Sequence, residues 1–343
     1  GEKSYEKVSI NGTVDRASDG TWRLDSMMAS LNNGRITGEG RLAYEKASGR
    51  VSSEGDLAWT TLTGLLPASV AVDTAGSLHY LLTGNLPEKQ WDSSGEGKLS
   101  ALTGLPENIV SLAGETPSFS WEGSYAGEAI RIRKGRIALA AGEIGVEGEV
   151  SPHVYPVALT IHAEAPELKP LAAAIHKEAA GRGVLDIEVK GTREKLMAQG
   201  KLVLEKVLYA SWHSKRIDTE FQLTREKETI RGPIKAVFRL EDADPLTVTA
   251  EGSYDGNEWS GRKVRFAMGK NQGTGAISYG PASKKFEGEG ELTLRDMGLL
   301  ARFTNRSFTG RAQVKGSFSL GAGTQKAHLT VDADDLTDVM GNA

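Results

Sequence analysis

The sequence predicts a mainly β protein: an elongated, curved, largely antiparallel repeat sheet, folded into a taco-like groove with a few short helices. Three observations predict this fold class. Short amphipathic strands recur along the 343 residues, segments of the chain repeat one another, and glycine is abundant, with 41 residues or about 12% against a typical ~7%. Hydrophobic residues make up only 39% and aromatic residues 6%, so we do not expect large globular cores.

The strands are recognised by alternation. Residues 183–191 read GVLDIEVKG, in which three apolar side chains alternate with three charged ones and a glycine closes each end. A period of two places Leu185, Ile187 and Val189 on one face of a strand. GSLHYLLTG at 76–84 repeats the arrangement. Similar segments, separated by turn signals, predict about 20 strands.

Helix is expected in few places. LKPLAAAIHKEAA at 168–180 is the main helical segment, and weaker equivalents lie near 62–70 and 296–304. The even spacing of LTGLLP, LTGNLP and LTGLP, which begin at 62, 82 and 102, marks strand ends and turns.

Internal repeats define the organisation. GEGRLAYEKASGRVSSEGDL from residue 38 and GTGAISYGPASKKFEGEGEL from residue 273 align without a gap at an offset of 235. Intermediate matches give a repeat of about 107 to 127 residues. We therefore expect one continuous structure cut from a longer protein: the end of a preceding unit at 1–60, units at 61–167 and 168–295, and the start of a further unit at 296–343.

Composition and motifs argue against several functions. The net charge of −4, with both signs interleaved, gives no case for nucleic acid, and there is no cysteine for disulfides or thiolate metal sites. No apolar run approaches 18 residues. The six histidines have no metal-ligand spacing, and the GEG motifs at 38–40, 95–97 and 288–290 lack the following helix that a phosphate cradle needs. We expect no enzyme, no metal and no cofactor.

The apolar faces are thin and need a covering. Their side chains are mainly Leu, Ile and Val, too small a set to fill a two-sheet sandwich. We therefore predict a partly empty trough that holds an apolar occupant. The predicted lining residues are Leu42, Leu57, Leu78, Tyr80, Leu185, Ile187, Val189, Leu202, Leu204, Leu292, Leu294, Val314, Phe318 and Leu320.

Six glycines share the register of this apolar face, where a packed core would have bulk: Gly38, Gly40, Gly273, Gly275, Gly288 and Gly290. One hypothesis is that they leave clearance for acyl chains in the trough. The alternative is a β-bulge or a tight bend, which also uses glycine.

The glycine-punctuated strands and Leu-rich short segments resemble the AsmA-like family, to which TamB belongs. The resemblance is carried by residues 167–211 and 294–320 and is one of pattern over most of the chain. It implies a periplasmic, taco-like groove in a Gram-negative (diderm) envelope, which moves phospholipid between the inner and outer membranes. It also implies attachment to the inner membrane through an N-terminal anchor that this sequence does not contain, and an outer-membrane partner protein.

Other functions remain open at this point. A structural or adhesive β-solenoid, like an autotransporter passenger, would have a filled interior and repeats near 20–30 residues. An outer-membrane protein assembly factor fits the same family resemblance. An extracytoplasmic glycan-processing enzyme would need a cluster of carboxylates.

Overall fold

The computed structural model describes residues 8–18, 20–31, 34–60, 73–104, 106–151, 157–174, 177–192, 194–209, 212–241, 243–297, 307–321 and 324–339. The chain divides into two compact units, Gly1–Thr192 (unit 1) and Arg193–Ala343 (unit 2). This division rests on contacts within the fold. The predicted repeat boundaries at 60/61, 167/168 and 295/296 concern sequence similarity, so they stay a prediction.

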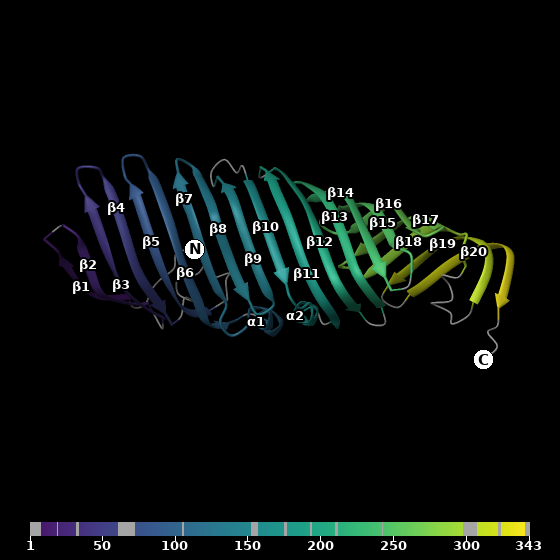
Figure 1. The fold of residues 1–343 in the computed structure, drawn as a ribbon, viewed down its shortest axis with the longest axis horizontal. Helices are drawn as coiled ribbons and strands as arrows, with labels where there is room; N and C mark the ends of the chain where they lie inside the picture. The colour runs from purple at the N-terminus through teal and green to yellow at the C-terminus, as the bar shows by residue number, and fades with distance from the viewer. Residues whose placement is uncertain are drawn as a thin grey trace. The chain divides into compact units, whose positions relative to one another are not determined.

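Unit 1 is an antiparallel meander in which each strand pairs with its neighbours in the chain (Figure 1). The predicted antiparallel β class is therefore confirmed here. The strands are β1 (Val8–Arg16), β2 (Trp22–Leu31), β3 (Gly34–Glu45), β4 (Arg50–Trp59), β5 (Asp73–Asn85), β6 (Gln90–Thr103), β7 (Ser118–Ala126), β8 (Ala129–Leu139), β9 (Gly142–Val150), β10 (Val157–Ala165) and β11 (Ala179–Gly191).

Unit 2 repeats the meander, and in its described residues the antiparallel pairs again join chain neighbours only. Its strands are β12 (Lys195–Tyr209), β13 (Trp212–Glu226), β14 (Thr229–Leu240), β15 (Leu246–Tyr254), β16 (Trp259–Met268), β17 (Asn271–Gly280), β18 (Lys285–Leu294), β19 (Ser307–Gly321) and β20 (Thr324–Val339). The aligned repeats at 38 and 273 thus both form a strand, a tight turn and a strand.

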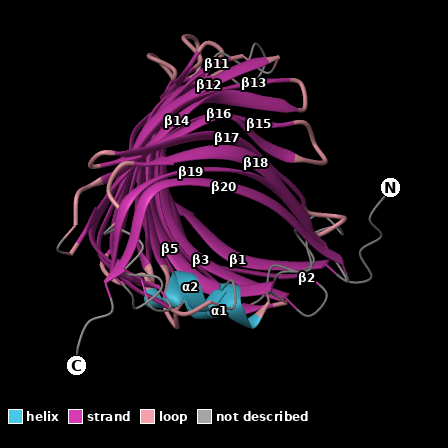
Figure 2. Ribbon diagram, turned by 90° about the vertical axis from the view of Figure 1, so that its right-hand side faces the viewer, coloured by secondary structure: helices cyan, strands magenta, loops and turns pink. Residues whose placement is uncertain are grey.

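Two short helices belong to unit 1. α1 (Glu107–Ala113) follows β6 and α2 (Lys169–Ala174) precedes β11, and the two lie side by side at one end of the strands (Figures 1 and 2). The side-chain amide of Asn108 donates a hydrogen bond of 2.5 Å to the carbonyl oxygen of Ala174. α1 was not predicted, because seven residues after a proline are too few to show a helical period.

The predicted helix at 168–180 is too long. α2 ends at Ala174, and β11 already begins at Ala179. Gly181 has a φ of +129°, outside the helical region, and glycine costs about 1 kcal/mol inside a helix. The segment 62–70 lies outside the described residues. Of the segment 296–304, only Asp296 and Met297 are described, and neither is helical.

The two ends of the strands differ. We call one the turn end, where connections 46–49, 86–89 and 127–128 join strands of unit 1 and 227–228, 255–258 and 281–284 join strands of unit 2. We call the other the packed end, because all seven buried hydrophobic residues that the structure describes lie there. These are Ala141, Ala172 and Ala174 in unit 1, and Met268, Leu294, Met297 and Ala312 in unit 2. The small core of each unit therefore closes one end of its sheet only.

Candidate functional site

Strand register gathers uncharged residues on one face of unit 1. Residues directly opposite each other in antiparallel strands share a face, so successive pairs form rows across β3–β11. Four such rows contain no Asp, Glu, Lys, Arg or His. They are Gly38–Leu57–Leu78–Gly97–Phe119–Ile137–Ile144–Ala163–Leu185, Gly40–Gly55–Tyr80–Gly95–Trp121–Gly135–Val146–Ile161–Ile187, Leu42–Ser53–Leu82–Ser93–Gly123–Ile132–Gly148–Leu159–Val189, and Tyr44–Val51–Gly84–Trp91–Tyr125–Ile130–Val150–Val157–Gly191. We call this surface the uncharged face of unit 1.

Unit 2 has an uncharged face built in the same way. One row crosses all nine of its strands: Leu202–Thr219–Ala236–Val248–Phe266–Gly273–Leu292–Val314–Val331. A second row lies at the turn end of β14–β19: Ile230–Tyr254–Trp259–Tyr279–Phe286–Leu320. Each unit thus carries a face with few charged residues, although 25% of the chain is charged. In unit 2, Arg225 lies on this face at the turn end, opposite Ile230.

The predicted lining residues all lie on these two faces. Thirteen of the fourteen are partly exposed, as expected for residues on the surface of a sheet, with Leu42 at 44% and Leu320 at 41% among the most open. Val314 sits in the same row as Leu292. Leu294 is the exception, because it is only 2% exposed and packs with Met297 and Ala312. Leu294 is a core residue of the packed end, so its assignment to an open lining was wrong.

No second layer packs on the uncharged faces within the described residues. No large side chain there is less than 2% exposed. The accessible surface of the chain is 22848 Å², against about 13,500 Å² for a compact monomer of 36.7 kDa. In unit 1 the four rows span about 38 Å across β3–β11 and about 20 Å along the strands, or close to 800 Å² in projection. Monomers rarely expose an apolar patch of that extent.

Aromatic rings on the uncharged faces lie over glycines of the neighbouring strand. Trp121 and Phe119 cover Gly95 and Gly97, and Phe318 covers Gly288, where a Cβ would lie 2.6 Å from two ring carbons. The same pairing joins Trp59 with Gly76, Trp91 with Gly84, and Phe266 with Gly273. Rings that lie over glycine flatten the face, because they spread along the sheet and do not stand out from it.

The six predicted clearance glycines therefore do not leave open room. Leu57 occupies the space over Gly38, and rings occupy it over Gly273 and Gly288. The other three face backbone: a Cβ on Gly40 would lie 2.6 Å from the carbonyl oxygen of Glu54, and Gly275 and Gly290 oppose each other in the same way. None of the six has a positive φ. The close approach of neighbouring strands, and not space for a ligand, requires glycine at these three positions.

Gly40→Ala is expected to destabilise unit 1 by about 1–3 kcal/mol, because the new methyl group meets backbone that can move only with the strand. The matched control is Gly145→Ala in β9, where a Cβ finds its nearest atom 3.8 Å away, at the carbonyl oxygen of His162. That control should be neutral or stabilised by up to about 1 kcal/mol. Urea unfolding measures both; equal stability of the two variants would contradict the close-approach role.

Three pairs of polar side chains on the uncharged face of unit 1 are hydrogen-bonded to each other within the sheet. The indole N–H of Trp121 donates to Ser93 Oγ (2.8 Å), and the indole N–H of Trp59 donates to Thr74 Oγ1 (3.1 Å). The hydroxyls of Tyr80 and Ser53 lie 3.2 Å apart. Among the described residues, no buried side-chain nitrogen or oxygen lacks a partner. The face can therefore be covered by an apolar molecule without leaving these groups unsatisfied.

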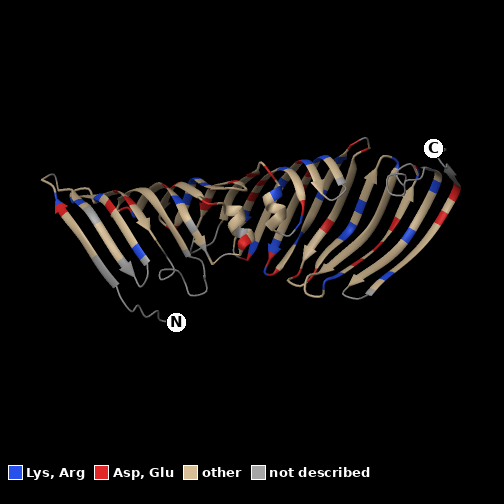
Figure 3. Cartoon of the chain, turned by 90° about the horizontal axis from the view of Figure 1, so that it is seen from below, with Lys and Arg blue, Asp and Glu red and all other residues tan. Residues whose placement is uncertain are grey.

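The opposite face of each sheet carries the charges, with both signs interleaved along the strands (Figure 3). Arg133 contacts Asp92 (2.8 Å) and Glu122 (2.9 Å), with all three side chains more than 40% exposed. Such pairs contribute at most about 1 kcal/mol each. In unit 2, hydrogen bonds from Arg216, and secondarily from Arg239, hold the pKa of Asp218 below its ordinary value. These ion pairs show that the charged face of each sheet is its solvated face.

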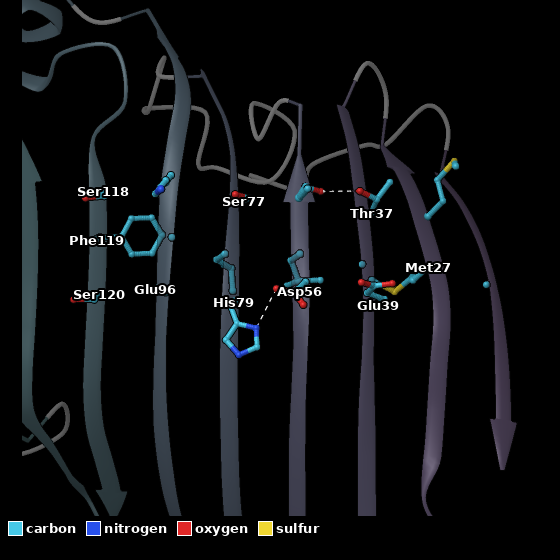
Figure 4. Close-up of a pocket in the computed structure, with 18 of the residues that line it drawn as sticks. Met27, Thr37, Glu39, Asp56, Ser77, His79, Glu96, Ser118, Phe119 and Ser120 are labelled. Atoms are coloured by element: carbon cyan, nitrogen blue, oxygen red, sulfur yellow. Dashed lines mark hydrogen bonds and ion pairs between the residues drawn. The ribbon is translucent and has the colours of Figure 1, made fainter. Parts of the chain in front are cut away.

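A hollow of about 1110 Å³ opens on β1–β8 of unit 1 (Figure 4). Its lining includes Glu39, Asp56, His79 and Glu96, one row of the charged face, and His79 Nδ1 lies 3.0 Å from Asp56 Oδ1. The hollow is also bordered by Gly38, Leu57 and Leu78, which were predicted for the trough. The next row of the uncharged face, which contains Gly40, does not border the hollow. The hollow therefore lies on the charged side, and is distinct from the predicted apolar trough.

Comparison with known proteins gives no relative: no family model, no curated protein and no solved structure matches the chain. Within the described ranges, no helix has the length and apolar character needed to cross a bilayer. The same residues hold no cluster of three or more His or carboxylate side chains arranged for a metal ion. The uncharged faces are the most distinctive surfaces of the chain.

Sequence reasoning missed part of this site. Trp91, Trp121, Tyr125 and Trp259 belong to the uncharged faces, but the predicted lining omitted them. Within its own strand, Trp91 shares the parity of Leu99, and Trp121 and Tyr125 share that of Phe119; this alternation was the signal that could have found these three. The aromatic–glycine pairs could not be found in this way, since they depend on which strands are neighbours.

Proposed function

We propose that this chain is a segment of a bridge-like lipid-transfer protein, which shelters phospholipid acyl chains on its uncharged faces between the inner and outer membranes of a diderm envelope. The single observation that carries the proposal is the absence of charge from four complete rows across β3–β11 of unit 1. A face of this extent needs an apolar covering, and an acyl chain is an apolar molecule with no hydrogen bonds to satisfy.

The energetics favour such an occupant. Sheltering an acyl chain from water gains about 0.8 kcal/mol for each methylene, or roughly 12 kcal/mol for 16 carbons. The flattened aromatic–glycine pairs offer many similar contacts and no deep pocket that would fix one position. A ligand held in this way stays out of water and can still slide.

The meander also weighs against the β-solenoid alternative. A solenoid stacks parallel coils around a filled interior. The paired strands that the structure describes are all antiparallel, and each pairs with its chain neighbours. The resemblance to AsmA-like proteins, which comes from the sequence pattern, agrees with the lipid proposal and supplies the proposed periplasmic location, the inner-membrane anchor and the outer-membrane partner protein.

Site-specific photo-crosslinking tests the proposal. A photoreactive amino acid at Ile187, on the uncharged face, is expected to capture phospholipid in cells. The matched control is the same amino acid at Glu188, the next residue, which faces the other way and pairs with Thr160. Mass spectrometry of the purified adducts identifies the lipid. Equal labelling at both positions, or none at Ile187, would reject an acyl-chain function for this face.

A further inference from the structure

The turn end of each uncharged face carries amphipathic aromatic residues. In unit 1, Tyr44, Trp91 and Tyr125 lie in the last row before the tight turns. In unit 2, Trp259 and Tyr279 hold the corresponding place. Three of these rings are widely open: Tyr44 is 48%, Trp259 51% and Tyr279 42% exposed.

These rings are held in place and present both an apolar body and a polar tip. Tyr254 stacks on Trp259 with ring centroids 4.4 Å apart, and its hydroxyl donates to the carbonyl oxygen of Gly256 in the turn (2.7 Å). Tyr and Trp gather where an apolar phase meets a polar one, such as the level of lipid headgroups. The buried hydrophobic residues of each unit lie at the packed end, where Tyr209 of unit 2 is also 47% exposed.

Three lysines in the turns stand in a backbone conformation that lysine disfavours. Lys89, Lys227 and Lys284 have φ values of +53°, +56° and +49°. The repeat shows what the position ordinarily takes: Gly49 corresponds to Lys284 at the offset of 235 and has a φ of +69°. Left-handed backbone is strained for a residue with a Cβ, and glycine would relieve the strain. Lys206 and Lys263, which lie within strands, share this conformation, so it is the position in the turns that distinguishes Lys89, Lys227 and Lys284.

What these three lysine side chains offer a ligand is their positive charge. Among the described residues, none of these three ammonium groups forms an ion pair within the protein, although Lys285 beside them pairs with Glu287 at 2.8 Å. Glu88 and Glu228 adjoin Lys89 and Lys227 in the chain, so the turn end carries both signs. A phospholipid headgroup brings a phosphate, and a zwitterionic one also brings an ammonium group.

We infer that the turn end is the headgroup lip of each unit. The acyl chains point along the strands toward the packed end, the Tyr and Trp row lies at the level of the glycerol backbone, and the phosphate meets Lys89 in unit 1 and Lys227 and Lys284 in unit 2. This inference rests on the proposed function, to which it adds the orientation of the lipid and the groups that recognise its phosphate.

Two photoreactive phosphatidylcholines test the orientation. One carries a diazirine in its headgroup and the other at the end of an acyl chain, and each is presented to the full chain in phosphatidylcholine vesicles. Mass spectrometry is expected to place headgroup adducts at 44–51, 86–91 and 281–286, and acyl-end adducts toward the packed end. The reverse order, or one distribution for both probes, overturns the inference. If neither probe labels the protein, the proposed function itself fails.

The lysines are tested separately. A variant with Lys89→Gly, Lys227→Gly and Lys284→Gly should bind phosphatidylglycerol vesicles about 150-fold more weakly, because three charges near the membrane surface, each worth about 1 kcal/mol, are lost. Its capture of diacylglycerol, which has no phosphate, should be unchanged, and its melting temperature should not fall because the strain is relieved. Arginine at the same positions should retain binding. Undiminished phosphatidylglycerol binding by the glycine variant would overturn the phosphate contact.

Discussion

Ile187→Asp is expected to remove most lipid capture and to leave the protein folded. Ile187 lies in a row with Ile161 and Val146, on a face that no described layer covers. A carboxylate there would be desolvated by every bound acyl chain and would have no partner on the face. A penalty of about 2 kcal/mol, typical of a charge placed on a lipid-facing sheet, reduces affinity roughly thirtyfold. Native mass spectrometry of co-purified phospholipid measures capture, and circular dichroism measures folding.

Two controls separate charge from damage to the strand. Ile187→Met keeps the face apolar and should retain capture. Ala158→Asp introduces the same carboxylate on the charged face of the adjacent strand, opposite Lys190, and should have little effect. If Ile187→Asp unfolds the protein, Ile187 is an ordinary core residue and the face is covered in a way that the lipid proposal does not include.

Leu294→Ala should have the largest effect on stability, with a loss of about 2–5 kcal/mol in the free energy of unfolding of unit 2. Its side chain is 2% exposed and packs with Met297 and Ala312 in the small core of the packed end. Few other described residues are as buried, so little remains to compensate for the cavity. Urea unfolding followed by circular dichroism provides the measurement.

Leu292→Ala is the matched control for Leu294→Ala. Leu292 belongs to the same strand and face but is only partly buried, so we expect a smaller loss of stability. For lipid capture we expect the opposite order: per folded molecule, Leu292→Ala should weaken capture more than Leu294→Ala does. Equal losses of stability would mean that the packed end is not the stabilising centre of unit 2.

Features of the fold that depend on residues close together in the sequence could be predicted, and features that depend on distant residues could not. Alternation within one strand is local, so Leu185, Ile187 and Val189 were placed on the uncharged face from the sequence alone. The segments that align at 38 and 273 form matching hairpins, with their turns at 46–49 and 281–284. The predicted helix at 168–180 is longer than α2 because the alanines of this segment favour helix. The glycines after Ala180 instead allow the chain to enter β11.

The rest of the site depends on which residues become cross-strand neighbours. Gly288 looked like an empty position because nothing in its own segment shows that Phe318 lies over it. In the sequence Leu294 has the same alternation as Leu292. It is buried because Met297, in the connection after β18, packs on it, and this contact is not visible in the strand pattern. The hollow near His79 requires eight strands to be assembled before it exists.

The pairing of strands only with their chain neighbours has a consequence for how each unit forms. Such a meander has low contact order, so no long loop must close before a strand gains its partner, and a hairpin can add to the growing edge as soon as it is synthesised. The same rule makes length adjustable. Insertion of one hairpin would widen a sheet by about 10 Å without changing any existing pair beyond the insertion point. A sheet assembled in this way can be lengthened by duplication of its segments, and a gapless match such as that between the segments from residues 38 and 273 is the pattern that duplication would leave.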